Sequence, residues 1–249
     1  MKRLPVPWLT ADPEAPFPPV HAALREPEGL LAVGGDLSPT RLLNAYRHGI
    51  FPWFSEGQPI LWWSPDPRMV FDTGRFCLAS RLRRSLKFSD WTLRADTNFA
   101  GVVGACAHAP RDGRQGTWIT PDMLDAYVEL HRLGHAHSIE VFEGDSLVGG
   151  IYGVAIGRMF FGESMFSARS GGSKIALAGL VRLLRGWEWP LIDAQVENPH
   201  LLSLGAKFLG RVAFMARVDR QTALPGQGGP WTQYLDGLPV RELSCKPLD

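Results

Sequence analysis

The sequence predicts an α+β fold in which a small N-terminal lobe, residues 1–66, precedes a larger domain, residues 67–249, built on a mixed sheet. Twelve of the 20 prolines and four of the nine tryptophans fall within the first 67 residues, so we expect that part to be largely irregular with one clear helix. The remainder alternates short β-branched and aromatic runs with helical patterns, as in a sheet covered by helices.

The helix of the small lobe is expected to begin after Ser38. Serine is a favoured N-cap, and Pro39 suits the first helical position because that position needs no amide hydrogen. Gly49 provides the stop. The apolar side of this helix comprises Leu42, Leu43 and Tyr46.

In the larger domain, Thr120 and Pro121 open a helix that Gly134 ends. Its apolar side comprises Leu124, Tyr127, Val128 and His131. Strands are expected at residues 138–142, 147–154, 158–161 and 191–196, with an apolar helix at residues 173–185 before the last of them. The order strand, strand, strand, helix, strand is similar to that of N-acyltransferases, and we therefore expect a GNAT-like mixed sheet.

Composition restricts the class of protein. In 249 residues, 45% are apolar and 20% charged, as in a globular protein, and no apolar run could span a bilayer, so no membrane partner is expected. The odd number of well-separated cysteines (Cys77, Cys106 and Cys245) suits a reducing cytoplasm and forms no zinc pattern. His135 and His137 with Glu140 lack a further ligand in pattern, so no metal is expected.

The net charge of +1 conceals a basic stretch at residues 75–94. The stretch contains six positive side chains and a single negative one, Asp90, so its net charge is +5. The positive residues are Arg75, Arg81, Arg83, Arg84, Lys87 and Arg94. Such a run is either a solvated helix face or a patch that contacts phosphates, and charge alone leaves both readings open.

Two strand segments, FFGESMF (residues 160–166) and LIDAQVEN (residues 191–198), carry the candidate active site. Successive side chains of a strand point to opposite faces, so Asp193 and Gln195 share one face. Glu163 lies among apolar neighbours, where a carboxylate is costly unless it has a partner or a task. If the strands are neighbours, Glu163, Asp193 and Gln195 form one polar spot in an apolar cleft.

Two further signals are weak on their own. The loop at residues 169–174 precedes a helix and could hold an anion, or it is an ordinary glycine-rich connection with a Ser173 cap. Four tryptophans are either core residues or platforms on which unpaired bases stack: Trp53, Trp62, Trp63 and Trp118. No Ser/His/Asp or Cys/His arrangement is evident, which disfavours a covalent acyl-enzyme.

Taken together, several long motifs resemble the leucyl/phenylalanyl-tRNA–protein transferase family. They span about residues 26–206 and include GLLAVGGDLSPTRLLNAYRHGIFPWF, ILWWSPDPR, GTWIT, LGHAHSIEV, LVGGIYGV, FFGESMF, LIDAQ and HLLSLGA. The resemblance implies transfer of Leu or Phe, and less well Met, from aminoacyl-tRNA, chiefly Leu-tRNA and Phe-tRNA, to the α-amino group of proteins with N-terminal Lys or Arg. The product is an N-degron. No cofactor is implied, because the ester of the charged tRNA is already activated.

The resemblance also implies roles for particular residues. Asp193, Gln195 and Glu163 are the expected catalytic residues, with Asp193 either a general base or an orienting group. The adenosine end of the tRNA would lie beside Trp53 and Trp118. The aminoacyl pocket would comprise Phe160, Met165, Leu177 and Ile192. The tRNA backbone would contact Arg81, Arg83, Arg84 and Lys87.

Two rival functions remain at this level. A CoA-dependent N-acetyltransferase fits the loop and the topology, but it leaves the basic stretch and the tryptophan-rich lobe without a role. An RNA-binding adaptor leaves the cluster of Glu163, Asp193 and Gln195 without a purpose. A monomer is the simplest assembly.

Overall fold

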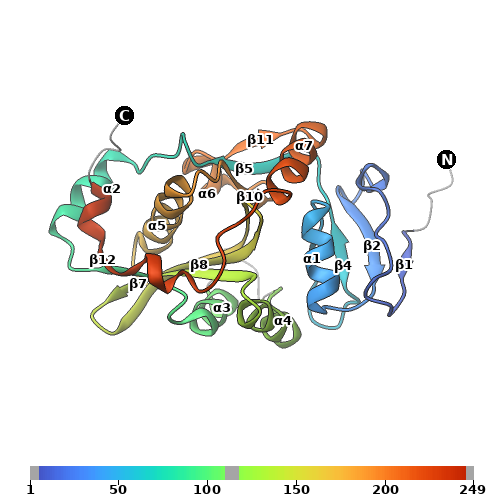
Figure 1. The fold of residues 1–249 in the computed structure, drawn as a ribbon, viewed down its shortest axis with the longest axis horizontal. Helices are drawn as coiled ribbons and strands as arrows, with labels where there is room; N and C mark the ends of the chain where they lie inside the picture. The colour runs from blue at the N-terminus through green and yellow to red at the C-terminus, as the bar shows by residue number, and fades with distance from the viewer. Residues whose placement is uncertain (1–5, 110–117, 245–249) are drawn as a thin grey trace.

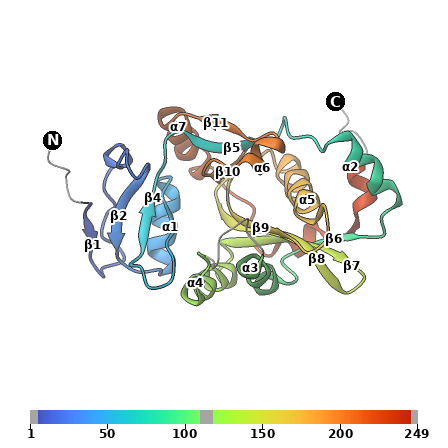
Figure 2. The same cartoon turned by 180° about the vertical axis from the view of Figure 1, so that it is seen from behind.

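The structure, a computed structural model, describes residues 6–109 and 118–244. Cys245, together with Gly116 and Thr117 of the GTWIT motif, lies outside these ranges. The molecule is elongated, with the small lobe at one end of its long axis and helix α2 (Ser80–Ser85) towards the other (Figures 1 and 2).

The small lobe is more regular than the sequence predicts, because it contains a four-stranded sheet in the order β1-β2-β4-β3. Its strands are β1 (Trp8–Leu9), β2 (Leu30–Gly34), β3 (Phe51–Pro52) and β4 (Leu61–Trp63). The strands are two to five residues long, and Pro52 lies on an edge strand, where a missing amide hydrogen is tolerated. Short runs between prolines gave too little alternation to be recognised. The expected helix is α1 (Pro39–Arg47), capped by the Ser38 side chain.

The larger sheet has eight strands in the order β11-β5-β10-β9-β8-β7-β6-β12. Their bounds are β5 (Arg68–Asp72), β6 (Thr92–Ala95), β7 (Ala136–Glu143), β8 (Ser146–Ile156), β9 (Met159–Ser167), β10 (Leu191–Gln195), β11 (Lys207–Leu209) and β12 (Asp236–Pro239). Strand β10 pairs parallel to β9, whereas the other pairs are antiparallel. The predicted α+β class and mixed sheet are therefore confirmed.

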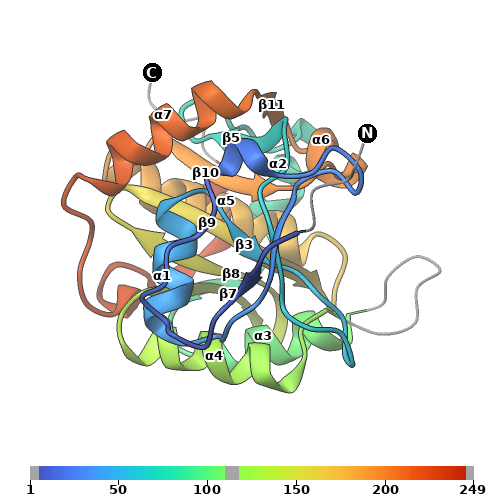
Figure 3. The ribbon, with the colours of Figure 1, turned by 90° about the vertical axis from the view of Figure 1, so that its right-hand side faces the viewer.

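Helices cover both faces of this sheet. On one face lies α5 (Gly172–Gly186), and on the other lie α3 (Phe99–His108) and α4 (Pro121–Arg132), as Figure 3 shows from the end of the molecule. The chain continues through α6 (Pro199–Ser203) and α7 (Arg211–Thr222), and α7 packs beside α1 of the small lobe. Short 3₁₀ helices complete it: η1 (Val20–Ala22), η2 (Leu86–Phe88), η3 (Trp231–Tyr234) and η4 (Val240–Ser244).

Strand alternation divides the interior into two cores. Along β8, Tyr152 and Val154 belong to the core beneath α1, α3 and α4, whereas Ile151 and Ala155 belong to the core beneath α5. The strand, strand, strand, helix, strand order expected from the sequence is found as β7, β8, β9, α5 and β10. The division of the chain at residue 66 remains a prediction.

Candidate active site

An open cavity of about 1270 Å³ lies between the small lobe and the end of the large sheet. The lobe supplies residues 51–56, Gln58, Leu61 and Trp63 to its wall. The opposite wall comes from the start of α4 and from β9, β10 and the segment after β10. Glu163, Asp193 and Gln195 all line this cavity, so the two segments singled out in the sequence meet as expected.

Glu163 is held by three polar side chains. Tyr46 Oη, from α1, and Gln195 Nε2 each lie 2.7 Å from Glu163 Oε1. Tyr127 Oη, from α4, lies 2.7 Å from Oε2, and the two phenol oxygens lie 2.6 Å apart. The small lobe and the larger domain therefore both contribute to the surroundings of one carboxyl group.

Burial governs the ionisation of this group. Desolvation raises the pKa of the Glu163 carboxyl from 4.5 to about 7, and the negative charge of Asp193 acts in the same direction. Donated to an ionised carboxylate, hydrogen bonds from Tyr46, Tyr127 and Gln195 would oppose the rise without cancelling it. The pKa values of both phenols lie well above their ordinary range, first because of burial and then because Glu163 is close. Glu163 is thus able to change its protonation state near neutrality.

Asp193 is bonded in a different way, through a buried ion pair with Arg68 of β5. Arg68 Nε and Nη2 donate to the two carboxylate oxygens, each at 2.8 Å. The guanidinium also donates to the Gly49 carbonyl at 3.0 Å and lies between the rings of Phe51 and Phe214. Such bidentate pairing fixes the orientation of the Asp193 carboxylate.

The end of β10 is irregular at the point where it enters the site. A bulge separates Asp193 from Gln195, and Gln195 has a φ of +62°, which is uncommon for a residue other than glycine. Its amide donates to Asp193 Oδ1 at 2.9 Å while its side chain reaches Glu163. Arg68 thus fixes Asp193, Asp193 fixes the bulge, and the bulge directs Gln195 towards Glu163.

The cavity also has an apolar wall. Three of the four residues expected in the aminoacyl pocket line it: Met165, Leu177 and Ile192. Phe160 does not line the cavity, because it is buried in the core beneath α5 and packs against Trp231. Trp53, 37% exposed, and the half-buried Trp118 line the cavity as well, whereas Trp62 is fully buried and donates to the Gly34 carbonyl.

Comparison with known proteins identifies the family. The model of the leucyl/phenylalanyl-tRNA protein transferase family matches residues 70–219, and that of its N-terminal domain matches residues 35–66. A leucyl/phenylalanyl-tRNA–protein transferase of Xanthomonas oryzae pv. oryzae is 67% identical over 225 residues, 90% of each chain. The corresponding protein of Xylella fastidiosa is 63% identical over 220 residues, 87% of this chain and 90% of that one.

The chain belongs to the leucyl/phenylalanyl-tRNA–protein transferase family. Likenesses among solved structures are remote. FemX has a TM-score of 0.44 at 11% identity, covering 70% of this chain and 67% of that one. A GCN5-related N-acetyltransferase from Kribbella flavida has a TM-score of 0.32 at 10% identity, covering 69% of this chain and 61% of that one.

The basic stretch of this transferase lies outside the cavity. Arg81 and Arg84 of α2 and Lys87 of η2 are exposed and Arg83 is half-buried, while Leu82 and Leu86 face the core. Among the described residues, none of these four basic side chains is within ion-pair distance of a carboxylate. Helix α2 lies away from the small lobe (Figure 1). The charges are therefore available to a partner long enough to reach from the cavity to α2.

The loop before α5 is used for close packing. Gly171, with a φ of +93°, is the N-cap, and Ser173 is not the cap. A Cβ atom on Gly149 would lie 2.5 Å from the backbone of Gly172. The Ser173 amide donates to Ser167 Oγ, and the amides of Gly172 and Ile175 also have acceptors. Residues 169–174 do not line the cavity.

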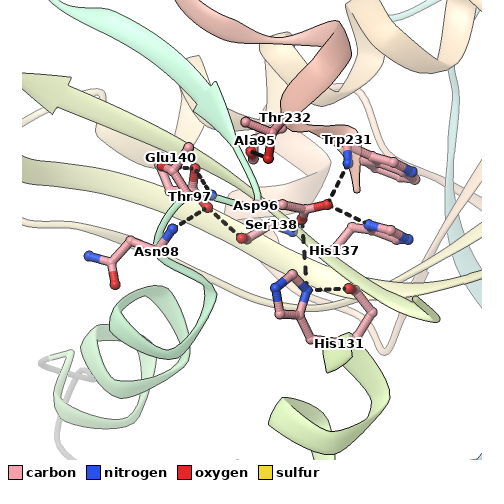
Figure 4. A network of polar contacts seen from close by, with 11 residues as sticks. Ala95, Asp96, Thr97, Asn98, His131, His137, Ser138, Glu140, Trp231 and Thr232 are labelled. Atoms are coloured by element: carbon pink, nitrogen blue, oxygen red, sulfur yellow. Dashed lines mark hydrogen bonds and ion pairs between the residues drawn. The ribbon is translucent and has the colours of Figure 1, made fainter. Parts of the chain in front are cut away.

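Two of the residues considered as metal ligands take part in a buried network (Figure 4). His137 Nδ1 lies 2.8 Å from Asp96 Oδ2, and its ring stacks on Trp231 at 4.0 Å. Glu140 accepts from Ser138 and Thr97, and burial raises its pKa to about 7. Within the described residues, no cluster of three metal-ligating side chains is found. This network joins β6, β7 and η3.

Three residues of the site were missed by reasoning from sequence: Tyr46, Tyr127 and Arg68. Both tyrosines were assigned correctly to apolar helix faces, and both are fully buried. Their hydroxyl groups nevertheless need partners, since a buried phenol is apolar only along its ring. The sequence signal that could have pointed to such partners was Glu163, because a buried carboxyl group requires hydrogen-bond donors from other elements.

Proposed function

We propose that the chain transfers leucine or phenylalanine, and less well methionine, from aminoacyl-tRNA to the α-amino group of proteins that begin with Lys or Arg. Family membership supports this reaction class. The observation that carries it to this chain is the cavity, which combines a polar cluster around Glu163 with an apolar wall and two tryptophans. The reaction would take place in the cytoplasm and produce an N-degron. A monomer contains every residue used below.

The polar cluster suits aminolysis of an ester. The attacking amine must be neutral and positioned against the carbonyl carbon, and a proton must pass from the nitrogen to the leaving oxygen. Glu163 borders the cavity and titrates near neutrality, so it is our candidate for proton transfer. Asp193 is engaged with Arg68, and we therefore assign it the orienting role. Gln195 would hold Glu163 in place.

The apolar wall suits an unbranched hydrophobic aminoacyl group. Met165, Leu177 and Ile192 present no charge, so selection would depend on shape and apolar area. Residues branched at Cβ would collide with the rim beside the ester. Phe160 would act from behind this wall, through the packing of Ile192, with which it is paired across β9 and β10.

The remaining residues would bind the tRNA. Trp53 and Trp118 would hold the terminal adenosine by stacking, which is tolerant of sequence. Arg81, Arg83, Arg84 and Lys87 would contact backbone phosphates at a distance from the ester. Of the acidic residues that line the cavity, Asp193 is paired with Arg68, whereas Glu56 and Glu197 have no ion-pair partner among the described residues, and no Lys or Arg is part of the lining. These two acidic residues favour a cationic N-terminal side chain.

The loop before α5 argues against the CoA-dependent rival. A pyrophosphate would need free amides at this helix N-terminus. The terminal amides of Gly172 and Ser173 are instead bonded within the protein.

The test is a transfer assay with a peptide that begins with Arg. Labelled Leu-tRNA should label the peptide, and a peptide with an acetylated N-terminus should remain unlabelled. Labelled acetyl-CoA should not react. Transfer from acetyl-CoA alone would support the acetyltransferase, and tRNA binding without transfer to any acceptor would support an adaptor.

A further inference from the structure

Three side chains at the centre of the site make a closed set of contacts, which we call the carboxyl–phenol ring: Glu163, Tyr46 and Tyr127. Each phenol oxygen lies 2.7 Å from one oxygen of the carboxyl group, and the two phenol oxygens lie 2.6 Å from each other. Both tyrosines are fully buried and Glu163 is 9% exposed. Protein atoms must therefore satisfy the two phenol hydroxyl groups, and the protons available for the three contacts can be counted.

A hydrogen bond between two oxygens needs one proton. A neutral phenol supplies one, and an ionised carboxylate supplies none. With Glu163 ionised, two protons serve three contacts, and two oxygens face each other without a proton between them. With Glu163 protonated, three protons serve three contacts. Glu163 then donates to Tyr127, Tyr127 donates to Tyr46, and Tyr46 donates back to Glu163.

Among the described residues, no positively charged group contacts Glu163. The titratable groups that act on Glu163 are Tyr46 from α1, Tyr127 from α4 and Asp193 from β10, while Tyr152 from β8 acts on the two phenols. Behind Asp193 lies Arg68, whose guanidinium is bonded to Asp193 and to Gly49. The side-chain amide of Gln195 can donate to Glu163 Oε1 whether Glu163 is protonated or ionised. Burial independently favours the neutral carboxyl group.

We propose that the resting carboxyl–phenol ring holds three protons, so that Glu163 is a carboxylic acid whose proton Tyr46 and Tyr127 retain as positioning residues. This proton has a use that rests on the proposed function. When the amine attacks, a C–N bond forms, the C–O bond to the tRNA breaks, the nitrogen loses one proton and the leaving oxygen gains one. Glu163 gives its proton to that oxygen and takes the proton of the amine. The ring is thereby restored after each turnover.

The first experiment needs no tRNA and is therefore independent of the transfer reaction. Infrared difference spectra of the free enzyme across pH should contain the band of a protonated carboxyl group that is absent in Glu163→Gln. This band should disappear as the pH rises through about 7. An ionised Glu163 throughout the range between its ordinary pKa and neutrality would overturn the proposal.

Tyr127→Phe then distinguishes a ring that holds three protons from an ionised Glu163 that only accepts hydrogen bonds from the two tyrosines. In this variant one contact remains, between Tyr46 and Glu163, and the phenol proton suffices for it. The protonated state therefore loses more hydrogen bonds than the ionised state, and the pKa of Glu163 should fall by about one unit. If the tyrosines only donate to a carboxylate, losing one destabilises the charged form and the pKa rises. A rise, or no shift, would contradict the ring.

Two further variants complete the test. Tyr46→Phe should lower the pKa of Glu163 as Tyr127→Phe does. Tyr152→Phe is the matched control, because Tyr152 is buried and packs edge-on against Tyr127 without belonging to the ring, and it should leave the pKa nearly unchanged. The pH profile of single-turnover transfer should move to lower pH in Tyr127→Phe by the same amount. Absence of transfer by the unaltered protein would refute the proposed function while leaving the spectroscopic result intact.

Discussion

Separating Arg68 from Asp193 should destabilise the whole protein. Asp193→Ala leaves the guanidinium, only 1% exposed, between Phe51 and Phe214 without its carboxylate. Removing one partner of a buried pair costs about 3–5 kcal/mol. That is a large part of the roughly 5–15 kcal/mol by which a domain is stable. At roughly 2–4 °C per kcal/mol for a chain of this size, the melting temperature should fall by roughly 6–20 °C.

A double variant distinguishes the loss of the ion pair from the cost of leaving one buried charge without its partner. Arg68→Met combined with Asp193→Leu removes both charges and retains much of the volume. Its loss of unfolding free energy should be smaller than the sum of the losses in the single variants Arg68→Met and Asp193→Leu by at least about 2 kcal/mol. Transfer activity should nevertheless stay low, because no carboxylate remains to accept the hydrogen bond of the Gln195 backbone amide at the bulge.

Urea unfolding of the four proteins gives the coupling energy, and transfer from Leu-tRNA gives activity. Arg132→Met is the control, because Arg132 forms an exposed pair with Glu129 and should show no measurable loss of stability. Additive losses from the single variants, each below about 1 kcal/mol, would refute a buried, mutually dependent pair. Activity restored in the double variant would refute the orienting role of Asp193.

Three other expectations concern separate parts of the molecule. Replacing Arg81, Arg83 and Arg84 with alanine should reduce the slope of log K against log salt for tRNA binding by roughly 0.7–0.9 per lost phosphate contact. Transfer from an aminoacyl-adenosine donor should change little, and equal loss with both donors would indicate a role in folding. Burial raises the folded-state pKa of Glu140 to about 7, so its protonated form is favoured by folding and its contribution is lost as the pH rises from about 4.5 to about 7. In urea titrations Glu140→Gln should reduce that loss by up to roughly 3 kcal/mol, and an unchanged pH dependence would contradict the assignment. Met165→Ala should enlarge the space beside the apolar wall and shift kcat/KM towards Phe-tRNA over Leu-tRNA. An unchanged ratio of the two kcat/KM values would exclude Met165 from that wall.

The sequence predicted the elements whose patterns are long and locally complete. Helix α4 shows this, because Thr120, Pro121 and the apolar side are all contained in one short segment. Strands β5 and β11 were not predicted, because three to five residues between prolines, loops and helices carry no distinctive period. Strand β5 depends on pairing with β10, which is remote from it in the sequence, and β11 depends on pairing with β5.

Only the part of the candidate site that lies on β9 and β10 could be predicted from the sequence. Glu163, Asp193 and Gln195 could be recognised as polar residues on apolar strands, and they do meet. Which group bonds which could not be inferred, because the partners come from α1, α4 and β5 and no local pattern specifies such contacts. The bulge at Gln195 is equally hidden, since nothing in a single glutamine signals a positive φ.

The bonds that define the site join parts of the chain far apart in sequence. Tyr46 and Glu163 are separated by 117 residues, and Arg68 and Asp193 by 125. During synthesis, the chain up to Tyr127 would carry two of the ring's members with no carboxyl group to join them, and loop closure over such lengths must precede any bond. Incomplete or cleaved chains would therefore lack the centre altogether. A transferase that modifies other proteins would acquire that capacity only after its own folding is nearly complete.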